Sequence, residues 1–483
     1  MAHAGCRPLA RIAAVLTVAI GLSLSAPLRL VAEESAESST AEKRDPAKDA
    51  GALEAARSAE HYELLRLFAD TLDQVERNYV KEIDRRELME AAIRGMLAKL
   101  DQHSNYIPPT ELERFRSSVE NEFGGIGITV SMEDGQLVIV TPLYGTPAYR
   151  AGIRGGDAIL EIDGQSTAGM AIDEAVRRMK GKIGAEVRLK IKHAADDREE
   201  TLSIGRELIR VDSVLGDRRK ADDRWNFFYD EEQKIGYIRI TSFSRHTADD
   251  LRTALGELKQ NGMRALVLDL RNNPGGLLTT GIAVCDLFVS SGRIVSTSGR
   301  NAPERVWDAS ADGTFDGFPM AVLVNDYSAS ASEIVAACLQ DHKRAIVVGE
   351  RTWGKGSVQN IVELENGKSA LKLTTAGYLR PSGKNIHRFD GAKESEDWGV
   401  RPDEGFEVKL TEEEKSRLMV DRRKRDVIAA PKKESAAASD DSKPNAAAEA
   451  PVVDRQLQKA LEYLRQQLAP AAEASSVAEN QKD

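Results

Sequence analysis

The sequence predicts a multidomain α/β protein with an N-terminal helical segment, a glycine-rich β-domain, and an α/β core whose mixed sheet is covered by helices. Its 483 residues are too many for one hydrophobic core, so two or three domains are expected. Unbroken apolar strands alternate with helices from Lys234 to Val348, a pattern typical of a sheet buried on both faces. Glycine-punctuated strands precede this region, and apolar residues at helical spacing follow His61.

An export signal is predicted at residues 1–32. Arg7 and Arg11 precede an apolar run over residues 12–26, which is short for a membrane helix and typical of a signal peptide. We therefore expect an exported protein of the periplasm or cell envelope. Retention of this segment as an uncleaved membrane anchor stays open as the alternative.

Charge and residue types exclude several functional classes. The net charge of −10 disfavours nucleic-acid binding, which usually requires a basic face. The seven histidines are scattered and none forms an HExxH motif, so no metal site is evident and no cofactor is expected.

The cysteines leave one question open. Cys6 lies in the predicted signal segment, whereas Cys285 and Cys338 each lie on an apolar helix face. Two buried small hydrophobic side chains are the favoured interpretation, and a disulfide in an oxidising compartment is the other.

Composition shifts divide the rest of the chain. Segments rich in Ala, Glu, Ser and Lys are too polar to bury a core and are expected to be disordered. The predicted segments are a disordered leader at 33–57, the N-terminal helical region at 58–117, the β-domain at 118–208, the α/β core at 209–411, and a charged low-complexity tail at 412–483 with a short helix near 455–468. We expect that helix to dock on the core or on a second subunit.

The periodicity predicts the elements in order. Two amphipathic helices over residues 61–79 and 88–100 end before Pro108 and Pro109. In the core we expect strands at 235–240, 265–270, 294–298, 320–324, 345–348, 358–364 and 371–378, and helices at 247–259, 277–288 and 332–339.

The β-domain resembles a PDZ domain in the order of its elements. A glycine-rich turn at 123–130 runs into a strand, and further strands, a helix at 172–179 and a last strand at 186–192 follow. Successive N–H groups of such a turn can hold a peptide carboxylate while the peptide adds a strand beside it. The resemblance places this peptide-binding loop at Gly124, Gly125, Ile126 and Gly127.

Ser330 has two interpretations. Ser330 and Glu333 fit a capping box, which would be purely structural. A serine at a helix N-terminus also lies beside free N–H groups and the positive end of the helix dipole, which can stabilise an oxyanion.

Lys355 follows a strand inside a glycine-rich stretch at 349–356 that nearly matches a nucleotide P-loop. The P-loop requires Ser or Thr directly after the lysine, but Gly356 stands there and a strand pattern follows, so nucleotide binding is not expected. As a general base the lysine must be neutral, which requires a pKa far below the usual value of about 10.4, mainly through desolvation. A surface lysine on a turn is the other interpretation.

Further residues would complete a serine–lysine site. Gln359 lies on the same strand face as Lys355 and can orient the amine without charging it. Ala331 would supply one oxyanion N–H, and Gly275 or Gly276 a second, since Pro274 has no N–H.

Together these motifs resemble the carboxyl-terminal processing (tail-specific) serine protease family. The resemblance covers about residues 60–410 and rests on the stretches 100–106, 123–127, 236–243, 268–276, 328–333 and 349–356 with Gln359. Trp353 departs from the phenylalanine usual in the family.

The resemblance implies a catalytic Ser330, a general base at Lys355, an orienting Gln359, and oxyanion donors at Ala331 and at Gly275 or Gly276. It implies an exported endopeptidase that recognises the free C-terminus of a protein or peptide and cleaves upstream of it. A homo-oligomer or an adaptor stays open. The alternative function is a non-catalytic PDZ scaffold that binds C-terminal peptides and would tolerate loss of Ser330.

Overall fold

The computed structural model describes residues 46–428 and 452–479, so the predicted signal peptide lies outside the described residues. The chain divides into two units, Met1–Arg85 and Arg86–Asp483. None of the helices in the described ranges is both long and apolar enough to cross a membrane.

Helix α1 (Pro46–Asn78) forms the first unit and starts earlier than the sequence predicted. Residues 46–57, which we assigned to a disordered leader, are helical. Ala, Glu and Lys favour helix strongly, and their low hydrophobicity does not separate an exposed helix from a disordered segment.

The second predicted helix is confirmed as α2 (Arg85–Leu97). After it come strand β1 (Asn105–Ile107) and helix α3 (Pro109–Glu120). Pro109 stands in the first turn of α3, where its missing N–H costs nothing, so this proline begins a helix, whereas the previous helix already ends at Leu97.

The PDZ-like fold is confirmed as a sheet with a helix at its side. Its strands are β3 (Ile128–Glu133), β4 (Gln136–Pro142), β5 (Ala158–Ile162), β6 (Gln165–Ser166), β7 (Glu186–Lys192) and β8 (Glu199–Gly205), in the order β3-β4-β5-β7-β8 with β6 paired to β5. Helices α4 (Pro147–Arg150) and α5 (Ile172–Met179) complete it, and Ile139, Ile162 and Leu189 are fully buried in its core. The glycine-rich strand β2 (Glu122–Gly125) pairs outside this sheet, with β9 (Glu207–Arg210).

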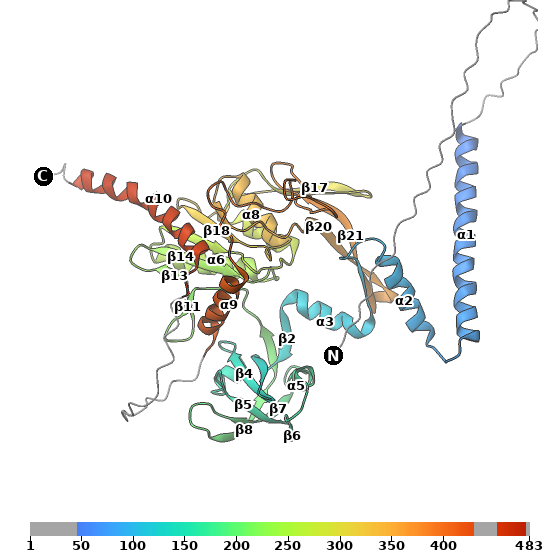
Figure 1. Ribbon diagram of the computed structural model, residues 1–483, viewed down its shortest axis with the longest axis horizontal. Helices are drawn as coiled ribbons and strands as arrows, with labels where there is room; N and C mark the ends of the chain where they lie inside the picture. Colours follow the sequence, from blue (N-terminus) through green and yellow to red (C-terminus); the bar gives the residue numbers. More distant parts are fainter. Residues whose placement is uncertain (1–45, 429–451, 480–483) are drawn as a thin grey trace, which may run out of the picture. The chain divides into compact units, whose positions relative to one another are not determined.

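The α/β core is built on a mixed sheet (Figure 1). Its parallel strands are β14 (Ile235–Ile240), β15 (Ala265–Asp269), β18 (Met320–Val324) and β19 (Ile346–Gly349), in that spatial order. The short antiparallel strands β10 (Val214–Leu215) and β13 (Phe228–Asp230) both pair with β14. A separate small ribbon joins β11 (Arg218–Arg219) to β12 (Trp225–Asn226).

The strand order explains how the sheet is covered. Because β14, β15, β18 and β19 follow one another across the sheet, right-handed crossovers bring their helices to the same face. Helices α6 (Thr247–Gln260), α7 (Leu278–Asp286) and α8 (Ala331–Asp341) form one large core with the even-numbered side chains of β14 and β15.

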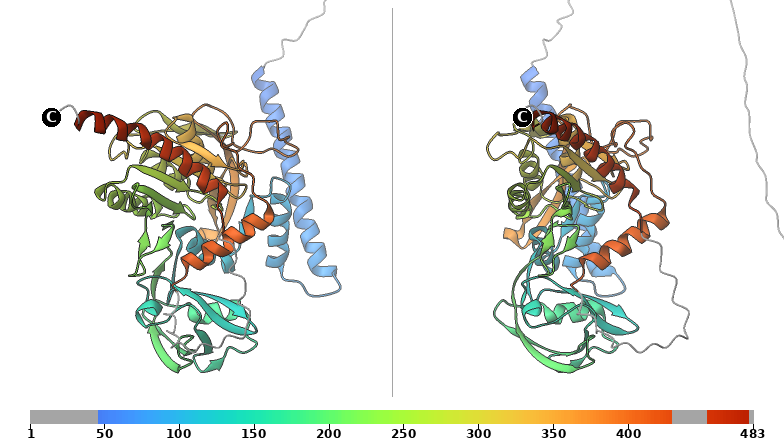
Figure 2. Two further views of the ribbon diagram at one scale, coloured as in Figure 1. Left: turned by 60° about the vertical axis from the view of Figure 1, so that its left-hand side comes forward. Right: turned by 90° about the vertical axis from the view of Figure 1, so that its left-hand side faces the viewer.

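The opposite face is covered by the tail. Helix α10 (Arg455–Glu479) packs Leu457, Ala460, Leu461 and Leu464 against the other side chains of the same strands, and Figure 2 shows it crossing the sheet. The expected docking of this helix on the core is confirmed, and the helix is longer than the predicted 455–468. The two-sided burial of the sheet was therefore predicted correctly, but its second cover comes from the C-terminus.

A second sheet carries the strands after β19. β20 (Ser357–Leu364) and β21 (Ser369–Leu379) form a hairpin around a short 3₁₀ turn (Glu365–Gly367), and β21 also pairs with β1 and with β16 (Arg293–Gly299). β16 in turn pairs with β17 (Ala302–Asp308).

The predicted low-complexity tail contains a helix that we did not predict. This helix, α9 (Glu412–Asp426), begins with a capping box at Thr411. Its Lys415 amine lies 3.0 Å from a carboxylate oxygen of Asp326 and 3.1 Å from one of Glu350. Such charge pairing holds a polar helix on the core, which composition alone does not reveal.

Cys285 and Cys338 are free and buried, as the favoured interpretation predicted. Burial raises the pKa of the Cys285 thiol well above its usual range.

Candidate active site

Ser330 stands at a strained turn directly before α8. Its backbone has φ 58° and ψ −115°, a conformation that costs a non-glycine residue energy and is often found at functional sites. Only 6% of the residue is exposed. Residues 325–330 join the end of β18 to α8, and the sequence lacks the GxSxG motif of a nucleophile elbow.

Glu333 is the centre of this region. It is fully buried in the first turn of α8 and accepts four hydrogen bonds. Its Oε1 accepts from the Thr352 hydroxyl at 2.6 Å and from the Gly354 N–H at 2.7 Å. Its Oε2 accepts from the N–H groups of Ser330 and Lys355, both at 2.8 Å.

This carboxylate therefore joins the two predicted catalytic segments. The backbone nitrogens of Ser330 and Lys355 bond the same oxygen, so they are no farther apart than twice 2.8 Å. A second link runs from the Trp353 N–H to the carbonyl of Ser328 at 3.0 Å. The capping box that we predicted for Ser330 is present, and it also serves to hold the lysine segment.

The Glu333 carboxyl is arranged to be ionised although it is buried. Burial raises its pKa above the usual value, and the four donors oppose that rise because they favour the charged form. Each oxygen already accepts two hydrogen bonds, which leaves no room for a proton.

The Lys355 amine lies in a partly buried position with a depressed pKa. Burial, and next the charge of Lys372, lower the pKa of Lys355 to about 8, while Glu333 and Asp101 act in the opposite direction. The neutral base that the sequence argument required is therefore populated near neutral pH, and desolvation is the main cause.

Gln359 holds this amine. Lys355 Nζ donates to Gln359 Oε1 at 2.7 Å, and Gln359 Nε2 donates to the hydroxyls of Ser357 at 2.9 Å and Thr374 at 3.2 Å. These two hydroxyls fix the amide so that its oxygen faces the amine. A neutral acceptor orients Lys355 without stabilising its charged form as a carboxylate would.

Two glycines allow the close packing that buries Lys355. A Cβ on Gly354 would lie 2.7 Å from the Cβ of Arg388, and one on Gly356 would lie 2.3 Å from the backbone nitrogen of His387. The backbone of residues 387–388 therefore lies directly against the lysine segment.

Burial raises the pKa of Tyr378 to about 12, and the neighbouring Ser330 side chain acts in the opposite direction. Among the described residues no hydrogen bond joins the Ser330 hydroxyl to the Lys355 amine, which bonds Gln359.

The glycine turn at 271–276 lies against Ser330. A Cβ on Gly275 would come within 2.7 Å of Ser330 Cβ and 3.0 Å of the Ala331 nitrogen. The Gly275 N–H donates to Asn273 Oδ1 at 2.8 Å. In the described part of the chain, no hydrogen bond engages the N–H groups of Gly276 and Ala331, which are two of the three predicted oxyanion donors.

The predicted peptide-binding loop belongs to the PDZ-like domain. Gly124 and Gly125 lie in β2, and Ile126 and Gly127 form the turn into β3. The Ile126 carbonyl accepts the Ala148 N–H at 3.0 Å, and the turn needs glycine at 127, where φ is +80°. The role of this loop in peptide binding stays a prediction.

Sequence reasoning missed several residues around the amine. Asp101 and Lys372 act on the Lys355 charge, and burial lowers the pKa of both His103 and His387 beside it. Pairing of β1 with β21 brings Asp101 there from a distant part of the chain. The capping-box pattern of Ser330 and Glu333 was visible in the sequence. The contact of Glu333 with the Lys355 segment was not.

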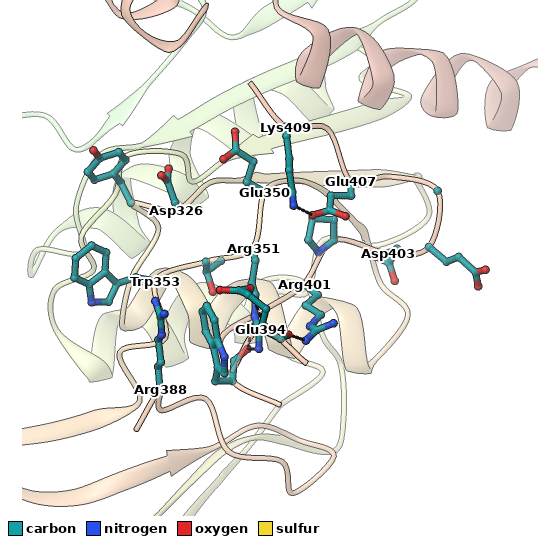
Figure 3. A pocket seen from close by; sticks show the side chains of 16 residues that line it. Asp326, Glu350, Arg351, Trp353, Arg388, Glu394, Arg401, Asp403, Glu407 and Lys409 are labelled. Carbon is teal, nitrogen blue, oxygen red and sulfur yellow. Dashed lines mark hydrogen bonds and ion pairs between the residues drawn. The ribbon is translucent and has the colours of Figure 1, made fainter. Parts of the chain in front are cut away.

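A cavity of about 900 Å³ adjoins the lysine segment (Figure 3). Trp353, which is half-exposed, lines it together with Arg351 and Arg388. Neither Ser330 nor Lys355 lines this cavity. We therefore do not assign the cavity as the candidate active site.

Comparison with known proteins identifies the domains. Residues 234–404 match the sequence model of Peptidase family S41, residues 116–192 that of the PDZ domain, and residues 24–108 that of the Activating protease CtpB N-terminal domain. The chain is 40% identical over 360 residues to the carboxy-terminal-processing protease of Bartonella bacilliformis, covering 73% of this chain and 77% of that protein. The chain belongs to the carboxy-terminal processing protease family.

Other members of the family are similar over a comparable length. The carboxyl-terminal-processing protease of Synechocystis sp. is 36% identical over 339 residues, covering 69% of this chain and 74% of that protein. A solved structure, the photosystem II D1 C-terminal processing protease, is 29% identical with a TM-score of 0.40 and covers 71% of this chain and 92% of that one. The peptidase-family match includes Ser330, Lys355 and Gln359.

Replacing Glu333 with glutamine tests the central carboxylate. The amide group would face two of the four donors, so we expect a loss of about 2–4 kcal/mol in the free energy of unfolding and a fall in kcat of about a hundredfold. Denaturant unfolding and peptide hydrolysis measure both. Glu257→Gln, which breaks an exposed ion pair with Lys220, is the matched control. Wild-type values for Glu333→Gln would contradict this role.

The pKa of Lys355 predicts a pH profile. The predicted role of Lys355 as general base requires the unprotonated amine, so kcat/KM should rise with pH and level off above a midpoint of about 8. Lys372→Gln should move this midpoint to higher pH, since it removes a positive charge that lowers the pKa. Lys368→Gln, an exposed lysine of the same hairpin, should leave it in place. An unchanged midpoint in Lys372→Gln would contradict the role of Lys372 in lowering the pKa of Lys355.

Proposed function

We propose that the chain is an exported serine endopeptidase that recognises the C-terminus of protein substrates through its PDZ domain and cleaves by a Ser330–Lys355 dyad. The observation that carries the proposal is the Glu333 carboxylate, which holds the backbones of both residues while the pKa of Lys355 is lowered to about 8. A turn that served only as a helix cap would need neither a buried lysine nor its glutamine partner.

The reaction follows from these groups. Ser330 Oγ attacks the scissile carbonyl carbon while its proton passes to Lys355 Nζ. The N–H groups of Ala331 and Gly276 receive the oxyanion, since the Gly275 N–H already bonds Asn273. The C–N bond then breaks as Lys355 gives the proton to the leaving amine. Water attacks the acyl carbon while Lys355 takes its proton. The ester C–O bond to Ser330 then breaks as Lys355 returns that proton to Ser330 Oγ, which releases the acid product and restores the neutral amine.

The lysine side chain must move for this reaction. Its amine bonds Gln359 at 2.7 Å, and among the described residues no hydrogen bond joins it to the Ser330 hydroxyl. Because Glu333 holds both backbone segments, rotation of the flexible Lys355 stem is the proposed route to the Ser330 hydroxyl. Gln359 would then act as the acceptor that holds the neutral amine ready.

The partners follow from the same proposal. Substrates would be proteins or peptides with free C-termini, whose carboxylate the N–H groups of Gly124–Gly127 would hold. Export to the periplasm or cell envelope, with membrane association if the N-terminus stays uncleaved, is part of the proposal, and fractionation of cells tests it. A homo-oligomer or an adaptor would be compatible with this activity.

Two substitutions test the chemistry. We expect Ser330→Ala and Lys355→Arg to abolish cleavage of an unfolded protein with an apolar C-terminus, since a guanidinium cannot act as a base near neutral pH. Fragments measured by mass spectrometry decide the result. Cleavage by Lys355→Arg at the wild-type rate would refute the base assignment. Binding without fragments by the wild-type protein would favour the scaffold.

The substrate terminus tests the recognition. A peptide with an amidated C-terminus lacks the carboxylate, so we expect its KM to rise about tenfold over the free acid through loss of charge-assisted hydrogen bonds. The same peptide as free acid is the control. Equal KM values would argue against capture of the C-terminus.

A further inference from the structure

The C-terminal helix α10 is tied to the core by the residue that precedes it. Asp454 Oδ1 accepts the Leu457 N–H at 3.0 Å and so caps the helix. The same carboxylate accepts two hydrogen bonds from Arg271, 2.9 Å from Nη1 to Oδ1 and 2.8 Å from Nη2 to Oδ2. The Arg271 and Asp454 side chains are 11% and 14% exposed, so water screens this bidentate pair only weakly.

Arg271 is the first residue of the glycine turn 271–276 in the candidate active site. Its guanidinium also bonds Asp269, the last residue of β15, with 2.6 Å from Nη2 to Oδ2. The following residue, Asn272, donates its N–H to Asn325 Oδ1 at 2.9 Å. The turn then runs to Gly275, whose backbone lies against Ser330.

A second residue of the tail supports the same contact. Gln456 is 1% exposed, and its Oε1 accepts from Arg271 Nη1 at 3.0 Å. Its Nε2 donates to the Val408 carbonyl at 2.9 Å. The guanidinium is therefore held by β15 on one side and by the start of α10 on the other.

We propose that Asp454 is a positioning residue for the peptidase reaction. Its carboxylate holds Arg271 and thereby fixes the turn 271–276, whose Gly276 N–H is the proposed oxyanion donor. The inference rests on the proposed function. It assigns a role in the active site to the C-terminal tail, which lies beyond the peptidase-family match at 234–404.

The geometry separates this role from simple folding. Without the Asp454 charge, Arg271 keeps its ion pair with Asp269, so no buried charge is left alone. The apolar contacts of α10 with the sheet also remain. What is lost is the charged, bidentate partner on the outer side of the guanidinium, where the neutral Gln456 oxygen remains. A small displacement of an oxyanion donor lowers the rate strongly.

The test compares Asp454→Asn with a matched control in the full-length protein. Asparagine caps a helix as well as aspartate, so α10 keeps its N-cap while the bidentate ion pair is lost. The control is Arg455→Gln, which breaks the half-exposed ion pair with Glu414 next to it. The measurements are kcat and KM for peptide hydrolysis, thermal unfolding, and hydrogen exchange of peptides covering 270–277 and α10.

We expect kcat of Asp454→Asn to fall about tenfold with KM within about twofold of wild type, since only the donor moves. Exchange over 270–277 should become about tenfold faster, whereas exchange in α10 should match the control. Asp454→Glu, which keeps the charge, should recover part of the lost rate.

An unchanged kcat, or faster exchange in α10 together with a lower melting temperature, would overturn the inference. The first outcome would show that the turn needs no support from Asp454, and the second that the residue only holds the helix. If the wild-type protein cleaves no substrate, the proposed function fails instead. The exchange rates over 270–277 would then still decide whether Asp454 restrains the turn.

Discussion

One buried anion organises this protein. The Glu333 carboxylate lies in the first turn of α8, where the helix dipole favours negative charge, and four hydrogen bonds replace the water it has lost. Its two oxygens are shared between the turn of Ser330 and the segment of Lys355. An uncompensated buried carboxylate would cost several kcal/mol, so both segments must be in place for the anion to be tolerated. The strained backbone of Ser330 is kept by the same contacts.

The same carboxylate creates an electrostatic problem, because it raises the pKa of the neighbouring amine. The structure limits the effect in two ways. The Glu333 carboxylate accepts its hydrogen bonds from backbone N–H groups and a hydroxyl. The Lys355 amine bonds the neutral amide of Gln359. Burial and Lys372 then outweigh the nearby carboxylates, and the pKa stays near 8. Position and partner, more than net charge, decide whether this lysine can act as a base.

A second constraint comes from topology. Strands that follow one another across a sheet place their crossover helices on one face, which leaves the other face bare and apolar. Here α10 covers it, and the residues at the start of α10 bond Arg271 at the edge where the glycine turn begins. Coverage of the sheet and support of the turn are therefore linked through one helix.

Local patterns in the sequence determined the elements of the core, the PDZ-like domain and the candidate residues Ser330, Lys355 and Gln359, because apolar period and glycine positions are properties of neighbouring residues. They also suggested that the lysine must be desolvated. Only the tertiary structure decided that Glu333 joins the two segments, that Asp101 and Lys372 act on the amine, and that a polar tail forms α9 and completes the sheet with α10. The reason is physical: hydrogen bonds and charges act through space between segments far apart in the chain, and composition does not record which donors will meet.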